Sequence, residues 1–247
     1  MPAYAAPIKK QDCAHCSLAT ICLPDGLSRE EMARLDLIIK RRRPKQRGEF
    51  VYRHGDPFRA VYAVRTGSVK TYTTVPDGRT MVTGFYLAGE LLGLEGIHTK
   101  HHVGNAKVLE TTSICEIPFA HLSTLGQQIP HLQSQVFRVL SREIGYEQQV
   151  MLLLGKKSSD ERLAAFLLRL AERYHHRGYA AQEFNLSMSR SDIANYLGLA
   201  IETVSRVFTR FNRQKLVTIN RKLVTIHDDA GLKALANDLV LPRPKCG

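Results

Sequence analysis

The sequence predicts an α+β protein with three consecutive parts: a domain of short strands, one long helix, and a C-terminal winged helix-turn-helix. Three observations predict this order. Short β-branched and aromatic runs separated by glycines fill residues 49–120, and a 3-4 apolar spacing begins after Pro130. A helix–glycine–helix–hairpin pattern then occupies residues 187–226. We expect four segments: an arm (1–26), the strand domain (27–129), the long helix (130–155) and the C-terminal domain (156–247).

The composition is that of a globular protein with an excess of positive charge. The chain has 247 residues, is 44% hydrophobic and carries a formal net charge of +12. An excess of this kind suits a polyanion such as nucleic acid, although a merely basic surface is the alternative. No apolar run reaches the ~18 residues that span a bilayer, and the N-terminus lacks the apolar core of a secretory signal. We therefore expect a cytoplasmic protein with no membrane partner.

The cysteines are crowded at the N-terminus. Cys13, Cys16 and Cys22 form a C-x2-C-x5-C array, and Cys115 lies far along the chain. Three closely spaced thiolates and one remote thiolate can hold either a zinc ion or a cubane iron–sulfur cluster. The loop between the three is small and apolar, which suits a cluster shielded from water. Zinc, and free thiols in a flexible arm, stay open as alternatives. Cys246, the penultimate residue, is left out of this set.

Ser28, followed three residues later by Glu31, predicts a capped helix over residues 29–39. We interpret the basic run that follows, residues 40–43, as a solvated linker. In the strand region, Asp77-Gly78 separates two alternating runs and predicts a hairpin. Many short strands with regular turns are typical of a sandwich, barrel or jelly roll. Three histidines here are scattered, and we expect them to be solvated: His98, His101 and His102.

The helix after Pro130 is expected to run for about 24 residues and to carry a coiled-coil seam. The seam residues follow one another at spacings of three and four: Phe137, Leu140, Ile144, Glu147, Met151 and Leu154. In a parallel two-fold dimer Glu147 would face its own copy, and like charges there cost stability. Gly145 weakens the same turn. This predicts a dimer that forms only with additional support; alternatively, the seam is shifted and Glu147 points outward.

The C-terminal domain begins with a helix that Ser158 or Ser159 can cap. Its sharpest pattern is a short helix over residues 190–197, a turn at Gly198, a second helix over 201–212 and a hairpin. We expect the inward face to consist of Ile193, Leu197, Leu199, Val204 and Val207.

The opposite face of the second helix carries polar side chains suited to double-stranded DNA. Arg206 can bond a guanine edge, Glu202 can accept from a cytosine amino group, and Ser205 can touch a thymine methyl or a phosphate. The basic residues expected to bind phosphates are Arg210, Arg213, Arg221 and Lys222. The chain has no Gly-rich dinucleotide loop, nucleophile elbow or H-E-x-x-H motif, so we expect no enzyme.

Together these parts resemble a regulator of the Crp/Fnr family: an N-terminal β-roll (a cyclic-nucleotide-binding-like jelly roll), a coiled-coil dimerisation helix and a C-terminal winged helix-turn-helix. The cysteine array is similar to that of the FNR/ANR branch, the oxygen-sensing iron–sulfur regulators. Matching segments include Thr83-Gly-Phe-Tyr-Leu-Ala-Gly, Thr112-Ser-Ile-Cys-Glu-Ile-Pro-Phe, Met151-Leu-Leu-Leu-Gly-Lys-Lys, Glu161-Arg-Leu-Ala-Ala-Phe and Gly198-Leu-Ala-Ile-Glu-Thr-Val-Ser-Arg.

The resemblance implies that the four cysteines hold a [4Fe–4S] cluster, which promotes a homodimer. It implies that Glu202, Ser205 and Arg206 read a palindromic TTGAT...ATCAA-type site, controlling genes of anaerobic metabolism. It also implies RNA polymerase as a partner, through the loop that contains Arg79. The Arg-Ser pair of the cyclic-nucleotide branch is missing around residues 101–106, so cyclic AMP is not expected. The alternative is a Crp-like regulator with structural zinc or another small effector in the β-roll.

Overall fold

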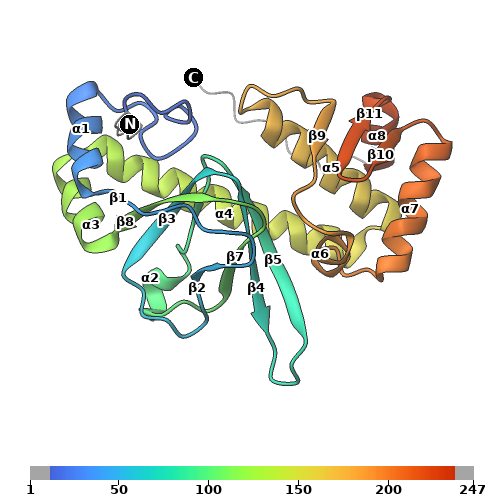
Figure 1. Ribbon diagram of the computed structural model, residues 1–247, viewed down its shortest axis with the longest axis horizontal. Coiled ribbons are helices and arrows are strands. Elements are labelled where there is room, and N and C mark those ends of the chain that lie inside the picture. The colour runs from blue at the N-terminus through green and yellow to red at the C-terminus, as the bar shows by residue number, and fades with distance from the viewer. Residues whose placement is uncertain (1–11, 237–247) are drawn as a thin grey trace, which may run out of the picture.

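The computed structural model describes residues 12–236 (Figure 1). It confirms the predicted order of a β-roll, a long helix and a C-terminal helix-turn-helix domain with a hairpin. The β-roll consists of two four-stranded sheets with strand orders β1-β8-β3-β6 and β2-β7-β4-β5. Its strands are β1 (Lys40–Arg41), β2 (Phe50–Tyr52), β3 (Ala60–Thr66), β4 (Ser68–Thr74), β5 (Thr80–Leu87), β6 (Leu91–Leu92), β7 (Asn105–Val108) and β8 (Ser113–Pro118).

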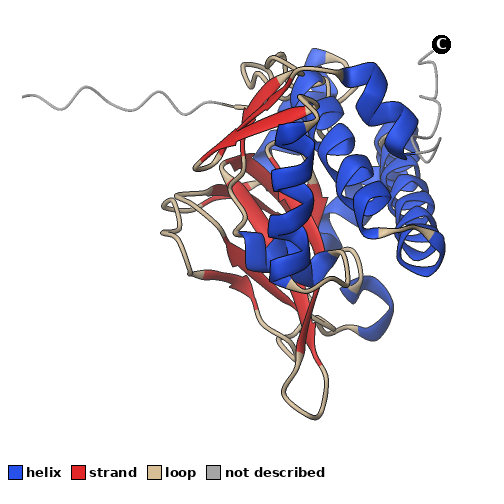
Figure 2. Ribbon diagram, turned by 90° about the vertical axis from the view of Figure 1, so that its right-hand side faces the viewer, coloured by secondary structure: helices blue, strands red, loops and turns tan. Residues whose placement is uncertain are grey.

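The predicted hairpin joins β4 and β5, and it projects from the rest of the roll (Figures 1 and 2). Gly78 takes φ +87° in its turn, a value that suits glycine. Three helices belong to this part: α1 (Arg29–Ile38), α2 (Gly96–Thr99) and α3 (Phe119–Gln128). Ser28 and Glu31 cap α1 reciprocally, as predicted.

Two expectations about the β-roll were wrong. Residues 40–43 are not simply a solvated linker, because Lys40 and Arg41 form β1 and pair with β8. Arg41 turns toward the interior, where its guanidinium binds Asp36. His102 is not solvated, since it is only 1% exposed and stacks on the Tyr52 ring at 3.7 Å. Its Nδ1 lies 3.1 Å from a Glu95 carboxylate oxygen, which supplies the polar partner that burial requires.

The long helix, α4 (Pro130–Lys156), crosses behind the β-roll and reaches the C-terminal domain (Figure 1). One face packs on the roll through Leu132 and Val139. Another face carries the apolar stripe, and Phe137, Ile144 and Met151 on it are 61%, 58% and 65% exposed. Because large apolar side chains in a row gain stability when covered, this stripe is suited to contact with another surface. No described helix is both long and apolar enough to cross a membrane.

The C-terminal domain contains the two predicted helices of the helix-turn-helix and a wing. Its elements are α5 (Ser159–His175), β9 (Glu183–Asn185), α6 (Arg190–Tyr196), α7 (Ile201–Arg213), β10 (Val217–Asn220), β11 (Leu223–Ile226) and α8 (Asp229–Ala236). Reciprocal caps begin α5 at Ser158 and α6 at Ser189. The wing has a third strand, β9, which pairs with β11 and was not predicted. The predicted inward residues are buried, with Leu199 packed against the core from its edge.

The C-terminal domain is docked on β5 of the β-roll. Asn195 of α6 donates to the Thr80 carbonyl at 2.7 Å and accepts from the Val82 amide. Lys70 forms an ion pair with Asp192. A single buried apolar cluster runs across this contact and includes residues of β5, α5 and α6. The two domains therefore form one continuous packed unit.

A carboxyl at the edge of this contact gives stability a pH dependence. Burial, and then the charge of Glu90, raise the pKa of Glu143 on α4 to about 7, against opposing effects of Arg142, Arg173 and Arg169. Since this pKa is raised on folding, its stabilising contribution is complete below the unfolded value near 4.5. The contribution is lost as the pH rises through about 7.

Glu143→Gln should therefore stabilise the protein at pH 8 by about 1–3 kcal/mol and have almost no effect at pH 4.5. Urea unfolding of the variant and the wild type at both pH values measures this difference. Glu49→Gln, at an exposed position, is the control. An equal gain from Glu143→Gln at both pH values would contradict the assigned cause.

Candidate functional site

The four predicted cysteine ligands line one cavity between the N-terminal arm and the β-roll. Cys13, Cys16 and Cys22 come from the turns of the arm, and Cys115 comes from β8. The space is about 490 Å³, part of it open to solvent. Apolar side chains complete its lining: Leu18, Ala19, Leu23, Leu35, Ile39, Ala63, Val64 and Ile117. Sequence segments about 90 residues apart thus contribute thiols to the same apolar space. Cys246 lies outside the described residues.

Arg41, which the sequence interpretation missed, is a cationic side chain next to these thiols, and Arg65 also lines the cavity. Its Nη2 lies 3.6 Å from the Cys13 sulfur, and its guanidinium is ion-paired with Asp36. Asp36 also accepts a hydrogen bond from the Cys13 amide at 2.9 Å. The Arg41 Nε is buried and has no hydrogen-bond partner. An unsatisfied N–H and a positive charge beside the cavity both suit a group whose complex with the thiolates has a net negative charge.

Burial controls the protonation of these thiols. It raises the pKa of Cys22 to about 12, and the nearby Cys115 and Cys16 add to this effect. Burial also raises the pKa of Cys13 and of Cys115, while the charge of Arg41 opposes both shifts. Because metals bind thiolates and not thiols, binding of a positively charged metal centre would deprotonate these four cysteines.

The four thiols supply a donor set of the kind that holds a cubane cluster. They line one apolar cavity, and four thiolates around an apolar space are the ligands of such a group. With Arg41 beside them, the residues present fit a [4Fe–4S] group, whose complex with four thiolates is anionic.

The arm is tied directly to α4. Gln135, only 6% exposed, donates from its side-chain amide to the Asp25 carbonyl at 2.9 Å. Leu23 is buried in the core that also contains Val139 of α4. Gly26, at φ +74°, lies so close to the helix that a Cβ there would approach a His131 ring nitrogen to 2.4 Å. The segment that follows Cys22 therefore forms part of the surface on which α4 is seated.

The arm also touches the turn between β5 and β6. A Cβ at Gly89 of this turn would lie 2.8 Å from the Ile21 Cδ1 atom. The backbone there has φ +90°, so glycine suits the position for two reasons. The residue before Cys22 is thus packed against a turn of the β-roll.

The second candidate site is the outer face of α7, at the edge of the molecule farthest from the β-roll (Figure 1). Val204, Val207 and Phe211 anchor the helix in the domain core. The opposite face bears Glu202 and Arg206, both exposed, and Ser205, which is half-buried. The structure places the three predicted base-reading residues together on this face. Arg213, Arg221 and Lys222 are exposed, the last two at the tip of the wing.

Two features of this face were not predicted. Arg190, at the start of α6, lies with Nη1 3.4 Å from the Ser205 hydroxyl, and its guanidinium stands over Phe208. It therefore adds a positive charge to the predicted reading face. Arg210, expected to bind phosphate, forms an ion pair with Asp160 at 2.6 Å. Asp160 would thus compete with a nucleic acid for this arginine.

Asp160→Asn should release Arg210 for a phosphate. Each additional phosphate contact steepens the dependence of log K on log salt by about 0.9 on duplex DNA. We expect tighter binding at low salt and a slope that is larger by about this amount per chain, measured by anisotropy titrations at several salt concentrations. Asp229→Asn, which removes a charge paired with Lys233 on α8, is the control. An unchanged slope for Asp160→Asn would show that Arg210 does not contact phosphate.

Comparisons with known proteins agree with this architecture. Residues 161–235 match the model of the Crp-like helix-turn-helix domain, and residues 42–128 match that of the cyclic nucleotide-binding domain. Among solved structures, FixK2 from Bradyrhizobium japonicum has a TM-score of 0.74 at 29% identity. That similarity covers 80% of this chain and 97% of that one.

The chain is similar to two named relatives over nearly the whole length of each. The chain is 53% identical to the transcriptional activator protein Anr of Pseudomonas protegens, over 92% of this chain and 93% of the relative. It is 42% identical to the fumarate and nitrate reduction regulatory protein of Salmonella typhimurium, over 91% and 90%. These proteins are transcription regulators and not enzymes, as the sequence predicts for this chain. The chain therefore belongs to the Crp/Fnr family and is a DNA-binding transcriptional activator of the Anr/FNR type.

Proposed function

We propose that this regulator responds to oxygen through a [4Fe–4S] cluster held by Cys13, Cys16, Cys22 and Cys115. When bound, the cluster supplies an oxygen-labile centre at the junction of the arm and the β-roll. The observation that carries this proposal is the arrangement of the four thiols around one apolar cavity beside Arg41. The names of the relatives, which include a fumarate and nitrate reduction regulator, support it.

The contacts of the arm explain how binding or loss of the cluster would affect α4. An arm whose three thiols are joined to Cys115 through a cluster holds Asp25 and Leu23 against the helix, through Gln135 and the core around Val139. Without that link the arm loses the part of its folding free energy that the bound group supplies. The surface that α4 packs against is then less rigid. The exposed apolar stripe of α4 is consequently held less firmly in the position needed to bind a second copy of the chain. Only about 1.4 kcal/mol is needed for a tenfold change in dimerisation.

The dimer would present two α7 helices to successive major grooves, about 34 Å apart. Glu202, Ser205 and Arg206 would read each half of a TTGAT...ATCAA-type palindrome, controlling genes of anaerobic metabolism. A monomer holds only one half-site and binds weakly. The exposed tip of the β4–β5 hairpin, with Arg79 paired to Asp77, would be a contact for RNA polymerase.

Anoxic purification followed by iron, sulfide and zinc assays tests the proposal. We expect about four irons and four sulfides per chain, with a visible absorption that bleaches in air. Cys22→Ala should abolish cluster assembly, while Cys246→Ala, the matched control, should leave it intact. Full iron loading of Cys22→Ala would mean that the ligand set is wrong. Colourless protein with one zinc per chain would exclude the oxygen switch and leave the DNA-binding function standing.

A further inference from the structure

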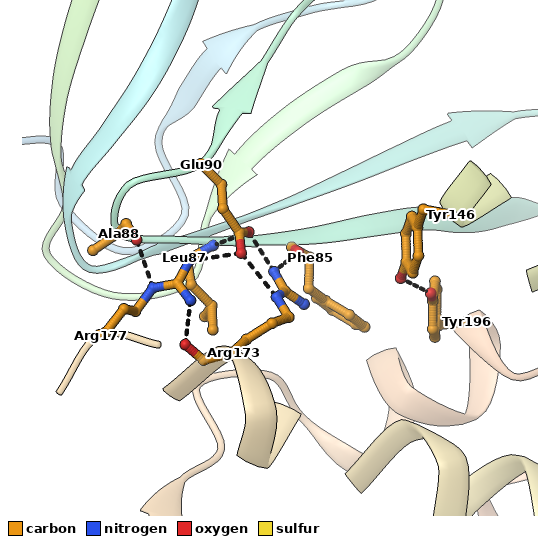
Figure 3. Close-up of polar contacts among 8 residues, drawn as sticks. All are labelled: Phe85, Leu87, Ala88, Glu90, Tyr146, Arg173, Arg177 and Tyr196. Carbon is orange, nitrogen blue, oxygen red and sulfur yellow. Dashed lines mark hydrogen bonds and ion pairs between the residues drawn. The ribbon is translucent and has the colours of Figure 1, made fainter. Parts of the chain in front are cut away.

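The contact between the β-roll and the C-terminal domain has a charged centre at Glu90. This residue lies in the turn between β5 and β6, and Figure 3 shows its carboxylate between two arginines of the C-terminal domain. Arg173 donates from Nε to the Oε1 atom at 2.9 Å, and Arg177 donates to the same oxygen at 2.6 Å. The Leu87 amide donates to Oε2 at 2.9 Å.

The arginines also bind the backbone of the β-roll. Arg173 donates to the Phe85 carbonyl and Arg177 to the Ala88 carbonyl, each at 2.5 Å. The side chains of Glu90, Arg173 and Arg177 are 21%, 17% and 6% exposed. The two positive charges hold the pKa of Glu90 at about 2, against the effect of burial. The group is thus a charge-assisted, mostly dehydrated network rather than a surface ion pair.

The rest of the contact between the domains combines apolar burial with the Asn195 hydrogen bonds and the Lys70–Asp192 ion pair of α6. The Phe85 ring lies 5.2 Å from the Tyr196 ring and 6.1 Å from the Phe166 ring. Apolar burial favours contact without fixing its angle, whereas two arginines on one carboxylate define a geometry. The Glu90 network is therefore one of two groups of directional contacts in the docking, and it is the group that holds the end of α5, whereas Asn195 and Asp192 hold α6.

The network lies at the C-terminal end of α5, far from the junction where α5 follows α4. At this junction, Arg162 of α5 donates to the Leu154 carbonyl of α4 at 2.7 Å, which ties the start of α5 to α4. Arg173 lies about 16 Å farther along the same helix axis. The α6 contacts attach the C-terminal domain to β4 and β5. The Glu90 network attaches it again through a different helix, and this further attachment restricts the rotation that the other contacts leave free. The reading face of α7 stays exposed in this position.

We infer that Glu90 is a positioning residue for DNA binding: it fixes the orientation of the C-terminal domain, and so the half-site spacing that the dimer accepts. Binding at the second half-site is intramolecular, with an effective concentration that depends on the stiffness of the connection. A C-terminal domain in a fixed orientation gives a high effective concentration at one half-site spacing. A loosely held domain gives a lower effective concentration at each of several spacings. The spacing part of this inference rests on the proposed palindromic site, but the orientation part does not.

Glu90→Gln keeps the shape of the side chain and removes its charge; Glu49→Gln, which removes an exposed carboxylate near Arg43, is the control. Small-angle X-ray scattering of the full chain should give a larger radius of gyration for Glu90→Gln than for the wild type, at matched oligomeric state. Anoxic protein is then titrated with duplexes in which TTGAT and ATCAA are separated by spacers varied one base pair at a time. The preference for the best spacer should fall about tenfold. Affinity for a single half-site should not change.

Wild-type scattering and a wild-type spacer profile for Glu90→Gln would overturn the inference. Because the scattering needs neither DNA nor the cluster, it separates this outcome from a failure of the proposed function. A wild-type protein with no spacer preference would contradict the palindromic site alone. If circular dichroism shows that Glu90→Gln is unfolded, Arg177→Met carries the same test, since Arg173 still neutralises Glu90 in that variant.

Discussion

Arg206→Met should weaken binding to a TTGAT...ATCAA duplex by roughly 30-fold or more. One bidentate contact to guanine discriminates by about 1–3 kcal/mol, and a palindrome makes that contact twice. The side chain is exposed on α7, and its only described contact is a 3.3 Å hydrogen bond to the Thr203 hydroxyl, so its removal leaves the domain core intact. The loss should therefore appear in binding and not in thermal stability.

The sharper measurement compares two duplexes, one with the guanine of each half-site and one with that base pair changed. The wild type should discriminate between them, and Arg206→Met should bind both about equally. Arg213→Met, at the exposed end of the same helix, should lose a similar amount on both duplexes because it is expected to bind phosphate. If Arg206→Met retained the wild-type preference for guanine, another residue would have to read that base.

Glu147→Ala should give a protein that dimerises in air. Glu147 is exposed on α4 between Ile144 and Met151, which are themselves mostly exposed. In the proposed two-fold seam the change removes a pair of like charges and adds two good helix formers. We expect the association constant to rise at least about tenfold, equivalent to 1.4 kcal/mol.

Sedimentation velocity of aerobic protein measures this effect directly, and DNA binding in air should follow it. Gln148→Ala changes the neighbouring exposed residue, off the stripe, and should stay as monomeric as the wild type. A monomeric Glu147→Ala would instead favour the alternative seam, in which Glu147 points outward.

The parts of the fold that were predicted correctly depend on short-range patterns. Ser28, Ser158 and Ser189 each cap a helix through a residue three positions later. The Asp77-Gly78 turn and the glycine between α6 and α7 also act within a few residues. The cysteine array is also a short-range pattern, and its three cysteines line the same cavity.

What was missed depends on partners far along the chain. A basic run beginning at Lys40 has the composition of a solvated linker, and only the distant β8 makes it a strand. Arg41 is buried because Asp36 and the cysteine cavity surround it. His102 is buried because the rings of Tyr52 on β2 and Phe58 before β3, both far from it along the chain, cover it. No local spacing indicates any of these contacts, since hydrophobic periodicity reports which side of an element is inside and not what it meets.

The Glu90 network also limits how such proteins can be recombined. A chimera that joins this β-roll to a foreign reading domain keeps the carboxylate but can lose both arginines. A buried charge left without its partner costs about 3–5 kcal/mol, a large part of the stability of an ordinary domain. The reverse chimera would leave Arg173 and Arg177 beside a surface without Glu90. The two domains are therefore not interchangeable modules, and a graft that aims to redirect this regulator to new sequences should exchange side chains on α7 and leave the body of the domain in place.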